Sequence, residues 1–393
     1  MKTIDEIELE GKRVFIRVDF NVPIGPDQTV TDDLRIRACL PTIQYAIKKN
    51  AIVLLASHLG RPKGEKNPQY SLAPVATRVM ELLKIPEVLF TESCVGNGVK
   101  KLSLEMKPGQ VMLLENLRFH KGEEANDEFF AKQLASLCDV YINDAFGAVH
   151  RAHASTVGMV PFVKEKGIGF LMKREIEFLN KVVSNPAHPF VAILGGAKVS
   201  DKIGVIENLL NHVDGLCLGG AMAYTFLAAQ GIEIGNSKVE KENIYTAKKI
   251  LERAKTKGIP ILLPSDHVIA QKMDAEAESQ VTKGPNIPSG WIGLDVGPKT
   301  VVAFSQILEG AKTIFWNGPL GLYEIEKFAE GTYSVARTVA SRQAATIIGG
   351  GDSAAAIHKI GREKKVAYIS TGGGASLEFI EGKKLPGLKA LGG

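Results

Sequence analysis

Apolar runs of strand length recur along the whole chain, and amphipathic stretches separate most of them. In the first half the runs are Arg13–Val18, Ala51–Ser57, Gln110–Glu115 and Asp139–Asn143. In the second half they are Pro189–Leu194, Gly215–Leu218, Ile259–Leu263, Lys312–Trp316, Ala344–Ile348 and Val366–Ile369. Between them, stretches such as Glu128–Ser136 and Asp201–Asn211 have apolar residues at helical spacing. This alternation predicts an α/β protein with parallel sheets that helices cover on both faces.

One amphipathic segment, Phe170–Val183, stands between the two halves, and the sequence SNP at 184–186 ends it. It is either a rigid spacer between two domains or an ordinary core helix of one domain. Because 393 residues exceed the usual size of a single hydrophobic core, we expect two domains. We place them at 1–170 and 185–375, with a linker helix at 171–184.

Composition excludes several classes of protein. Apolar residues make up 45% and charged residues 23%, as in ordinary globular domains, and no apolar run is long enough to span a membrane. The N-terminus is too acidic and polar for a signal peptide, so we expect a cytoplasmic protein. The net charge is +5, but no basic run is interleaved with aromatic residues, which argues against nucleic-acid binding. The four cysteines are scattered, which predicts buried thiols without disulfides or a metal cluster.

Polar side chains follow four predicted strands of the first half. They are Asp19 and Asn21, then His58 and Arg61, then Asn116, Arg118 and His120, and finally Asp144, His150, Arg151 and His153. In open parallel sheets, ligands bind beyond the carboxyl ends of the strands. One arginine or histidine there is usually a solvated loop residue, but four strand ends with polar groups, three of them with arginine and histidine, predict an anion site.

Arg35 and Arg37 follow Thr31, Asp32 and Asp33, which predict the start of a helix. Pro41 leaves open whether that helix begins or kinks there. A cation near a helix N-terminus opposes the helix dipole by ~0.3–1 kcal/mol, a penalty that a bound anion would reverse. Alternatively, both arginines are exposed and paired with the neighbouring aspartates.

In the second half, glycines follow the predicted strands. GGAKVSDKIG would place Lys198 and Lys202 on one helix face if a helix begins there, and GGGDS opens an alanine-rich helix with Asp352. Such junctions are anion sites, and a carboxylate beside a phosphate needs a cation such as Mg²⁺ between them. Alternatively, Asp352 is a plain N-cap. Neither a Walker motif nor a dinucleotide fingerprint is present.

Two anion-binding halves predict phosphoryl transfer between two bound substrates, which needs positioning and charge neutralisation rather than a protein nucleophile. One rival is a two-domain binding protein that closes on a phosphorylated acid without chemistry, but it leaves Asp352 and the lysine pair unexplained. Another rival is a dehydrogenase, against which the missing dinucleotide fingerprint counts.

Nine motifs then occur in a fixed order: RVDFNVP, RIRACLPTI, SHLGRP, LLENLRF, DAFGAVHRAH, GGAKVSDKI, FWNGPLGLYE, GGGDS and STGGGASLE. Together they closely resemble the phosphoglycerate kinase family over essentially the whole chain. The resemblance implies two Rossmann-like domains with parallel sheets flanked by helices and joined by an interdomain helix. It implies reversible phosphoryl transfer from 1,3-bisphosphoglycerate to Mg-ADP, giving 3-phosphoglycerate and ATP. We expect direct in-line transfer on domain closure by a monomer whose partners are small molecules.

The resemblance assigns the phosphoglycerate to the N-terminal domain and implies that the tail, 376–393, packs back on it. Asp19 and Asn21 would bind the glycerate hydroxyl and carboxyl region, and Arg35 would stabilise the transferring phosphoryl group. The phosphate and its neighbouring oxygens would be held by His58, Arg61, Arg118 and Arg151.

The resemblance assigns the nucleotide to the C-terminal domain. Lys198 would reach the transferring group, together with the amides of Gly372 and Gly373, and Lys202 would bind the inner phosphates. The pocket would be lined by Gly195, Gly196, Gly219, Gly220, Gly293 and Pro319 (adenine), Glu324 (ribose), Asn317, Gly350, Gly351, Asp352 and Ser353. Asp352 would ligate Mg²⁺. The sequence departs from the family's common residues at Ser353, where threonine is usual, and at Tyr323, where phenylalanine is usual.

Overall fold

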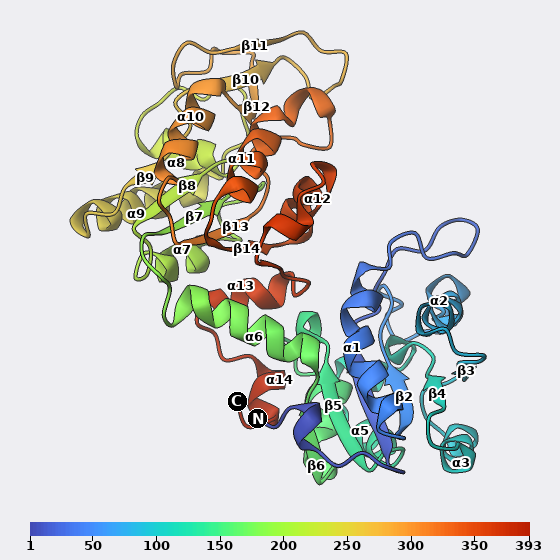
Figure 1. The fold of residues 1–393 in the computed structure, drawn as a ribbon. Helices are drawn as coiled ribbons and strands as arrows, with labels where there is room; N and C mark the ends of the chain where they lie inside the picture. Colours follow the sequence, from blue (N-terminus) through green and yellow to red (C-terminus); the bar gives the residue numbers. More distant parts are fainter. The chain divides into compact units, whose positions relative to one another are not determined.

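The structure is a computed structural model that describes residues 1–393, and its chain forms two compact units. Unit 1 comprises Met1–Glu177 and Lys384–Gly393, and unit 2 comprises Phe178–Lys383 (Figure 1). The helix expected at Phe170–Val183 is present with those bounds as α6, and the boundary between the units falls inside it. The chain returns to unit 1 after Lys383, later than the predicted start of the tail at 376.

Unit 1 is built on a six-stranded sheet with the order β3-β4-β2-β1-β5-β6, in which every neighbouring pair is parallel. The strands are β1 (Arg13–Val18), β2 (Ile52–Ala56), β3 (Leu89–Phe90), β4 (Val111–Leu113), β5 (Val140–Asp144) and β6 (Glu165–Ile168). The sequence pattern located the four central strands to within two residues at each end. It missed the edge strands β3 and β6, which are too short or too polar to stand out.

Helices cover both faces of this sheet, and residues on both faces of β1 are accordingly buried. Val14 and Ile16 pack in one core with Ile36 of α1, whereas Phe15 stacks on Tyr141 of β5 with ring centroids 6.1 Å apart. The helices of unit 1 are α1 (Leu34–Lys48), α2 (Ala73–Leu83), α3 (Asn97–Glu105), α4 (Lys121–Glu124), α5 (Glu128–Ala135), the first part of α6, and α14 (Pro386–Ala390).

Two further details of unit 1 concern the start of α1 and the ends of the chain. α1 begins at Leu34 and continues through Pro41, so the proline does not start the helix. The two ends of the chain lie side by side in this unit, where the side chain of Met1 adjoins Gly393 (Figure 1). The C-terminal segment is also attached by a hydrogen bond from the Gly387 N–H to the Val149 carbonyl (2.9 Å).

Unit 2 contains a second six-stranded parallel sheet with the order β15-β14-β13-β7-β8-β9. Its strands are β7 (Phe190–Leu194), β8 (Gly215–Leu218), β9 (Ile261–Leu262), β13 (Thr313–Asn317), β14 (Ala345–Gly349) and β15 (Tyr368–Ile369). The helices are the end of α6, α7 (Ile203–Leu209), α8 (Ala223–Ala229), α9 (Ile244–Thr256), α10 (Pro298–Ile307), α11 (Glu330–Ser341), α12 (Gly351–Lys359) and α13 (Gly374–Ile380).

A small antiparallel sheet in unit 2 was not predicted. Its order is β11-β10-β12, from the strands β10 (His267–Ala270), β11 (Ser279–Val281) and β12 (Ile292–Val296). These strands are short and partly polar, so they lack the continuous apolar run that marks a buried parallel strand. None of the helices in either unit combines the length and the apolar composition that a bilayer crossing requires.

Candidate functional site

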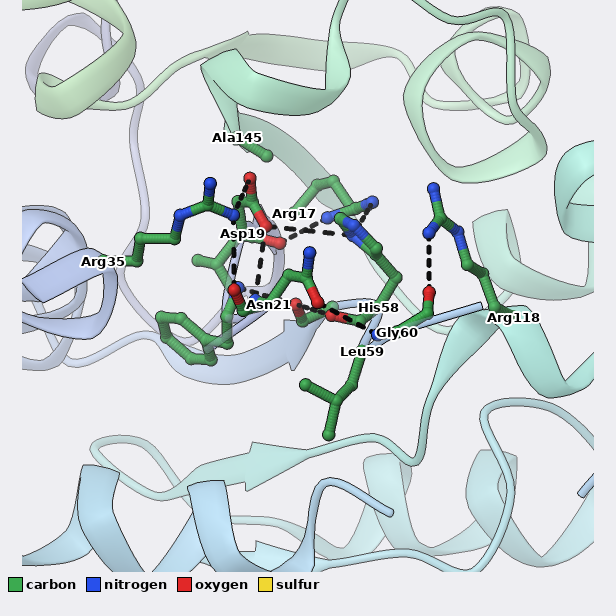
Figure 2. A network of polar contacts seen from close by, with 12 residues as sticks. Arg17, Asp19, Asn21, Arg35, His58, Leu59, Gly60, Arg118 and Ala145 are labelled. Atoms are coloured by element: carbon green, nitrogen blue, oxygen red, sulfur yellow. Dashed lines mark hydrogen bonds and ion pairs between the residues drawn. The ribbon is translucent and has the colours of Figure 1, made fainter. Parts of the chain in front are cut away.

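The central strands of the unit 1 sheet end at one edge, and the polar residues that follow them meet there. Asp19 and Asn21 follow β1, His58 follows β2, and Arg118 lies in a helical turn after β4. Arg35 comes from the first turn of α1. Figure 2 shows these five side chains in one network of polar contacts. The structure therefore brings together most of the residues predicted to bind the acid.

Asp19 joins the two sides of this network. Its Oδ2 accepts a hydrogen bond from Arg35 Nη1 at 3.2 Å, and the same nitrogen lies 3.3 Å from the Asn21 carbonyl oxygen (Figure 2). Asp19 Oδ1 accepts from the Asn21 N–H at 3.3 Å. Asp19 is buried and Arg35 is half-buried, so the carboxylate neutralises the guanidinium when no anionic ligand is bound.

His58 is held as a neutral ring. Arg17 Nη2 lies 3.2 Å from His58 Nδ1, and an arginine can only donate, so Nδ1 accepts and Nε2 carries the proton. Asp19 Oδ1 is 3.9 Å from the same nitrogen, beyond hydrogen-bond distance. Burial, reinforced by the charges of Arg17, Arg118 and Arg35, lowers the pKa of His58 well below its usual value. This side chain therefore offers an N–H donor at neutral pH without carrying a charge.

Arg118 is fixed by the loop that follows β2. Its Nη1 donates to the Gly60 carbonyl at 2.7 Å, while the Gly60 N–H donates to Asn21 Oδ1 at 2.9 Å. Asn116 joins this loop to the turn after β4, because its Nδ2 donates to the Leu59 carbonyl at 2.7 Å and its Oδ1 accepts from the Arg118 N–H at 3.0 Å. Loop-to-loop bonds thus preorganise the guanidinium before any ligand binds.

A second layer of buried polar residues supports this face, and sequence reasoning missed all of it except His153. Arg17 is 1% exposed, and its Nε donates to Ser155 Oγ at 2.8 Å. Ser155 in turn donates to the buried carboxylate of Glu123 from its N–H (2.9 Å) and from its hydroxyl (2.5 Å). Burial raises the pKa of Glu123 and lowers the pKa of His153 to about 4. The one sequence signal was a charged residue, Arg17, inside an otherwise apolar strand.

Arg61 and Arg151 of the predicted acid site are exposed. Arg61 makes no hydrogen bond or ion pair with the protein, and Arg151 Nε contacts His150 Nε2 at 3.2 Å. Neither arginine is bonded to the network around Asp19. Both guanidinium groups are thus without a carboxylate partner, and an anion could recruit them without breaking an ion pair.

Three other polar residues singled out in the sequence do not join the network. Arg37 pairs with Asp33 at 2.7 Å, as the alternative interpretation held. His120 stacks on Phe130 with ring centroids 5.0 Å apart. Asp144 was expected at the sheet edge with the others, but it is the last residue of β5, fully buried, and its Oδ1 accepts from the N–H of Met172 in α6 at 3.0 Å.

In unit 2, two adjoining cavities of about 260 and 250 Å³ follow the carboxyl ends of the parallel strands. The larger is lined by Gly196, Ala197, Gly220, Ala221, Tyr224, Lys238, Met273, Ile292, Gly293, Leu294, Pro319, Leu320, Gly321, Leu322, Glu324 and Asp352. The smaller is lined by Gly195, Gly196, Ala197, Lys198, Asp201, Lys202, Asn317, Gly318, Pro319, Gly350, Asp352, Ser353, Gly373 and Leu377. We call them the apolar cavity and the glycine cavity; they share Gly196, Ala197, Pro319 and Asp352.

The glycine cavity holds both predicted lysines, but not on a helix face. α7 begins only at Ile203, so the segment with Lys198 is a turn and the predicted helical spacing is wrong. Lys198 is exposed, whereas Lys202 is buried and its Nζ donates to Asn317 Oδ1. Burial lowers the pKa of Lys202 to about 8. One lysine of the cavity is therefore exposed, and the other is buried and held by Asn317.

Asp352 lies at the start of α12 but is not its N-cap. The N-cap is Gly350, with φ of 86°, and Asp352 is the second helical residue. Its Oδ1 accepts a hydrogen bond from the Tyr323 hydroxyl at 3.0 Å. Ser353 is buried, and its Oγ accepts from the Gly318 N–H at 2.6 Å. The carboxylate thus points to the cavities while the serine fastens the loop after β13.

The apolar cavity has a floor shaped by close backbone approach. Gly293 lies against the ring of the buried Tyr224, so that a side chain there would collide with its hydroxyl, and its N–H donates to Ser237 Oγ at 2.9 Å. Sequence reasoning missed Tyr224, which lies within α8, and it missed Lys238 and Met273, which do not directly follow a parallel strand.

Three predicted glycines line neither cavity. Gly219 faces the side chain of Leu320, and Gly351 is the first residue of α12. The Gly372 N–H donates to Ser370 Oγ at 3.2 Å, whereas Gly373 lines the glycine cavity. The other predicted nucleotide residues line at least one cavity.

Comparisons with known proteins agree with this arrangement. A family model described as phosphoglycerate kinase matches residues 4–383. The phosphoglycerate kinase of Anaeromyxobacter dehalogenans (strain 2CP-C) is 57% identical over 392 residues, covering 99% of both chains. That of Pseudothermotoga lettingae is 54% identical over 390 residues, covering 99% of this chain and 98% of the relative. The solved structure of phosphoglycerate kinase from Coxiella burnetii superposes with a TM-score of 0.89 at 42% identity, covering 100% of this chain and 98% of that one.

Proposed function

Because this chain belongs to the phosphoglycerate kinase family, we propose how its two units divide the work of that enzyme. The reaction is the reversible transfer of a phosphoryl group from 1,3-bisphosphoglycerate to ADP, giving 3-phosphoglycerate and ATP, a step of glycolysis. The enzyme is an ATP:3-phosphoglycerate phosphotransferase. In our proposal unit 1 binds the phosphorylated acid and unit 2 binds the nucleotide.

The acid would bind at the network in unit 1. Asp19 and Asn21 would hydrogen-bond the glycerate hydroxyl and carboxyl region, and His58 would donate from Nε2. Arg118, preorganised by Gly60, would hold the phosphate together with the exposed Arg61 and Arg151. Arginine forks suit these oxygens because they donate in pairs. Arg17 is buried and forms no ion pair with a carboxylate, so its positive charge would support anion binding.

The nucleotide would bind across the two cavities of unit 2. The apolar cavity would take adenine against Gly293 and Pro319, with Glu324 accepting from the ribose, and the glycine cavity would take the phosphates. Lys202 and Asn317 would face the inner phosphates, and Lys198 would follow the transferring group. Of the amides expected to bind that group, Gly373 lines the cavity, while Gly372 would first have to release Ser370.

Magnesium would accompany the nucleotide. Neither unit contains a cluster of three or more His, Cys, Asp or Glu residues able to hold a metal. Asp352 alone lines both cavities with a carboxylate, and this donor set fits Mg²⁺, which usually takes one or two carboxylates and completes its shell with phosphates and water. When bound, the ion would neutralise phosphate charge.

Transfer would be direct. The acyl phosphate of 1,3-bisphosphoglycerate loses its phosphoryl group to a β-phosphate oxygen of ADP, and the carboxylate leaves with the electron pair of the broken bond. The substrates supply nucleophile and leaving group, so the protein positions them and stabilises charge. Arg35 would give up its bond with Asp19 to stabilise the transferring group. Because the two ligands must touch, we propose that the units close during turnover.

The residues that line the two cavities support the assignment of the nucleotide to unit 2. Two variants, each expected to weaken the binding of one ligand only, test which unit binds which substrate. Arg61→Ala should raise the Kd of 3-phosphoglycerate at least about 10-fold, the loss expected for one charged hydrogen-bond partner. It should leave the Kd of Mg-ADP unchanged. Lys198→Ala should do the reverse, weakening Mg-ATP alone. Both side chains are exposed, so the fold should tolerate the changes. Calorimetry that finds either variant affecting the wrong ligand would contradict the proposal.

Two broader properties belong to the same proposal. We propose that the protein is a monomer, because each unit carries one complete set of ligand-facing residues. We also propose that it acts in the cytoplasm, because its substrates are soluble metabolites. Sedimentation of the purified chain at micromolar concentration should give the mass of a single chain, 42.4 kDa.

A further inference from the structure

The phenol of Tyr323 is tied to the carboxylate that faces both cavities. Its hydroxyl donates to Asp352 Oδ1 at 3.0 Å. The hydroxyl supplies the hydrogen of this bond, so the phenol is the donor and the carboxylate the acceptor. The ring is half-buried and packs on the hydrophobic core of unit 2, which fixes the hydroxyl in place. Asp352 Oδ2 makes no hydrogen bond or ion pair with the protein, so the two oxygens are not equivalent.

We propose that Tyr323 is a positioning residue that makes Asp352 bind a divalent cation through Oδ2 alone and so favours Mg²⁺ over Ca²⁺. This inference rests on the proposed role of Asp352 as the ligand of the nucleotide-bound cation. The partial positive charge of the hydroxyl hydrogen lies beside Oδ1 and opposes a cation at that oxygen. Chelation by both oxygens would break the Tyr323 bond.

The two cations respond differently to this restriction. Mg²⁺ is small, prefers octahedral coordination and usually takes a carboxylate through one oxygen, keeping several waters. Ca²⁺ takes six to eight oxygens and readily accepts both oxygens of a carboxylate. A fixed monodentate Asp352 therefore costs Ca²⁺ a ligand and costs Mg²⁺ nothing. Outer partners of ligating groups commonly change metal affinity about 10–100-fold.

The test is Tyr323→Phe, which removes the hydroxyl and keeps the ring that packs on the core. Tyr245→Phe is the matched control, because Tyr245 is 67% exposed on α9 and lines neither cavity. Calorimetry would measure the Kd of ADP with saturating Mg²⁺, with saturating Ca²⁺ and with EDTA. We expect Tyr323→Phe to shift the ratio of the Mg-ADP to the Ca-ADP affinity toward Ca²⁺ by about 10-fold. The EDTA value should stay unchanged, and Tyr245→Phe should shift nothing.

Asp352→Asn separates failure of this inference from failure of the proposed function. If that variant abolishes the effect of cations on ADP affinity while Tyr323→Phe leaves the Mg²⁺ to Ca²⁺ ratio at the wild-type value, Asp352 is the ligand and the role of Tyr323 is wrong. If Asp352→Asn keeps the full cation effect, the assignment of Asp352 is wrong and the inference falls with it. A weaker ADP affinity of Tyr323→Phe in EDTA would also overturn the inference, since the hydroxyl would then serve the nucleotide itself.

Discussion

At the scale of single residues, the acid site keeps several positively charged side chains close together in the absence of a ligand. Arg35 pairs with Asp19, and Arg61 is exposed. Arg118 donates to the Gly60 carbonyl and lies 3.4 Å from a carboxylate oxygen of Glu124. His58 is neutral, because burial and three arginines depress its pKa. Each of the two ion pairs has one partly exposed partner, Arg35 in one and Glu124 in the other, so a ligand would not have to separate a fully buried ion pair.

The tautomer of His58 gives a prediction at this scale. In glutamine the terminal nitrogen occupies roughly the place of imidazole Nε2, whereas in asparagine it occupies that of Nδ1. Since Nδ1 accepts from Arg17 and Nε2 is the donor, His58→Gln should keep the Kd of 3-phosphoglycerate within about 3-fold. His58→Asn should raise that Kd about 10-fold, the loss of one hydrogen bond to a charged group. Calorimetry at pH 7.5 measures both values, and the reverse order would show that the ring is turned over.

At the scale of elements, glycine junctions let loops approach each other in unit 2. Gly220 follows β8 with φ of +66°, and a Cβ there would lie 2.6 Å from the Gly196 nitrogen and 2.8 Å from the Pro319 oxygen. The three backbones therefore form one wall of the apolar cavity, and Gly196 and Pro319 also line the glycine cavity. Such contacts cannot be relieved by a flexible side chain, because the opposing atoms are backbone.

Gly220→Ala should accordingly damage both the fold and the nucleotide site. Gly231→Ala is the control, because Gly231 has a similar φ of +78° but open space around its Cβ position. Both alanines bear the cost of positive φ, about 1 kcal/mol, but only Gly220→Ala must also displace backbone. We expect Gly220→Ala to be at least about 1 kcal/mol less stable than the control in urea unfolding and to bind ADP at least about 10-fold more weakly. Equal losses in the two variants would contradict the close-approach argument.

The sequence predicted elements well where burial is continuous and poorly where it is not. β1, β8 and α6 have the predicted bounds because an unbroken apolar or amphipathic run defines each of them. The antiparallel strands are partly polar, and the turn at Lys198 resembles a helix start by spacing alone. The same holds for the site. The sequence identified residues that directly follow parallel strands. It did not identify Glu123 and Ser155, because the tertiary fold brings them to the site and no local sequence pattern indicates this.

At the scale of the whole molecule, one helix belongs to both units, and its first turn rests on a buried acid. Asp144 ends β5 and accepts from the N–H of Met172 through Oδ1, while its Oδ2 has no hydrogen-bond partner. Phe170 is anchored nearby through its N–H to Thr42 Oγ1 at 2.9 Å. Burial raises the pKa of Asp144 to about 7. The protonation state of one side chain is thus linked to the first turn of α6, in the part of the helix that belongs to unit 1.

This linkage gives Asp144 a stability effect of definite sign. Its folded-state pKa of about 7 lies above the ordinary value of about 3.9, so the folded protein binds the proton more tightly than the unfolded chain. Its contribution is therefore present at low pH and lost as pH rises through 7, at up to about 1.4 kcal/mol per pH unit between pH 4 and 7. Asp144→Asn keeps an oxygen for the Met172 N–H and removes the titration, so the unfolding free energy of the wild type should fall relative to that of the variant from pH 5 to 7.

Urea unfolding at pH 5, 6, 7 and 8 measures this difference in unfolding free energy. Asp32→Asn is the control, because Asp32 is exposed and its Oδ1 also accepts a hydrogen bond from a backbone N–H, that of Leu34 at 2.9 Å. The control should differ from the wild type by an amount that pH does not change over this range. Above pH 7 the Asp144 difference should level off, because the carboxyl is then ionised whether the chain is folded or not. A difference that stays flat from pH 5 to 8 would mean that the buried acid keeps its charge over this range, and it would contradict a raised pKa for Asp144.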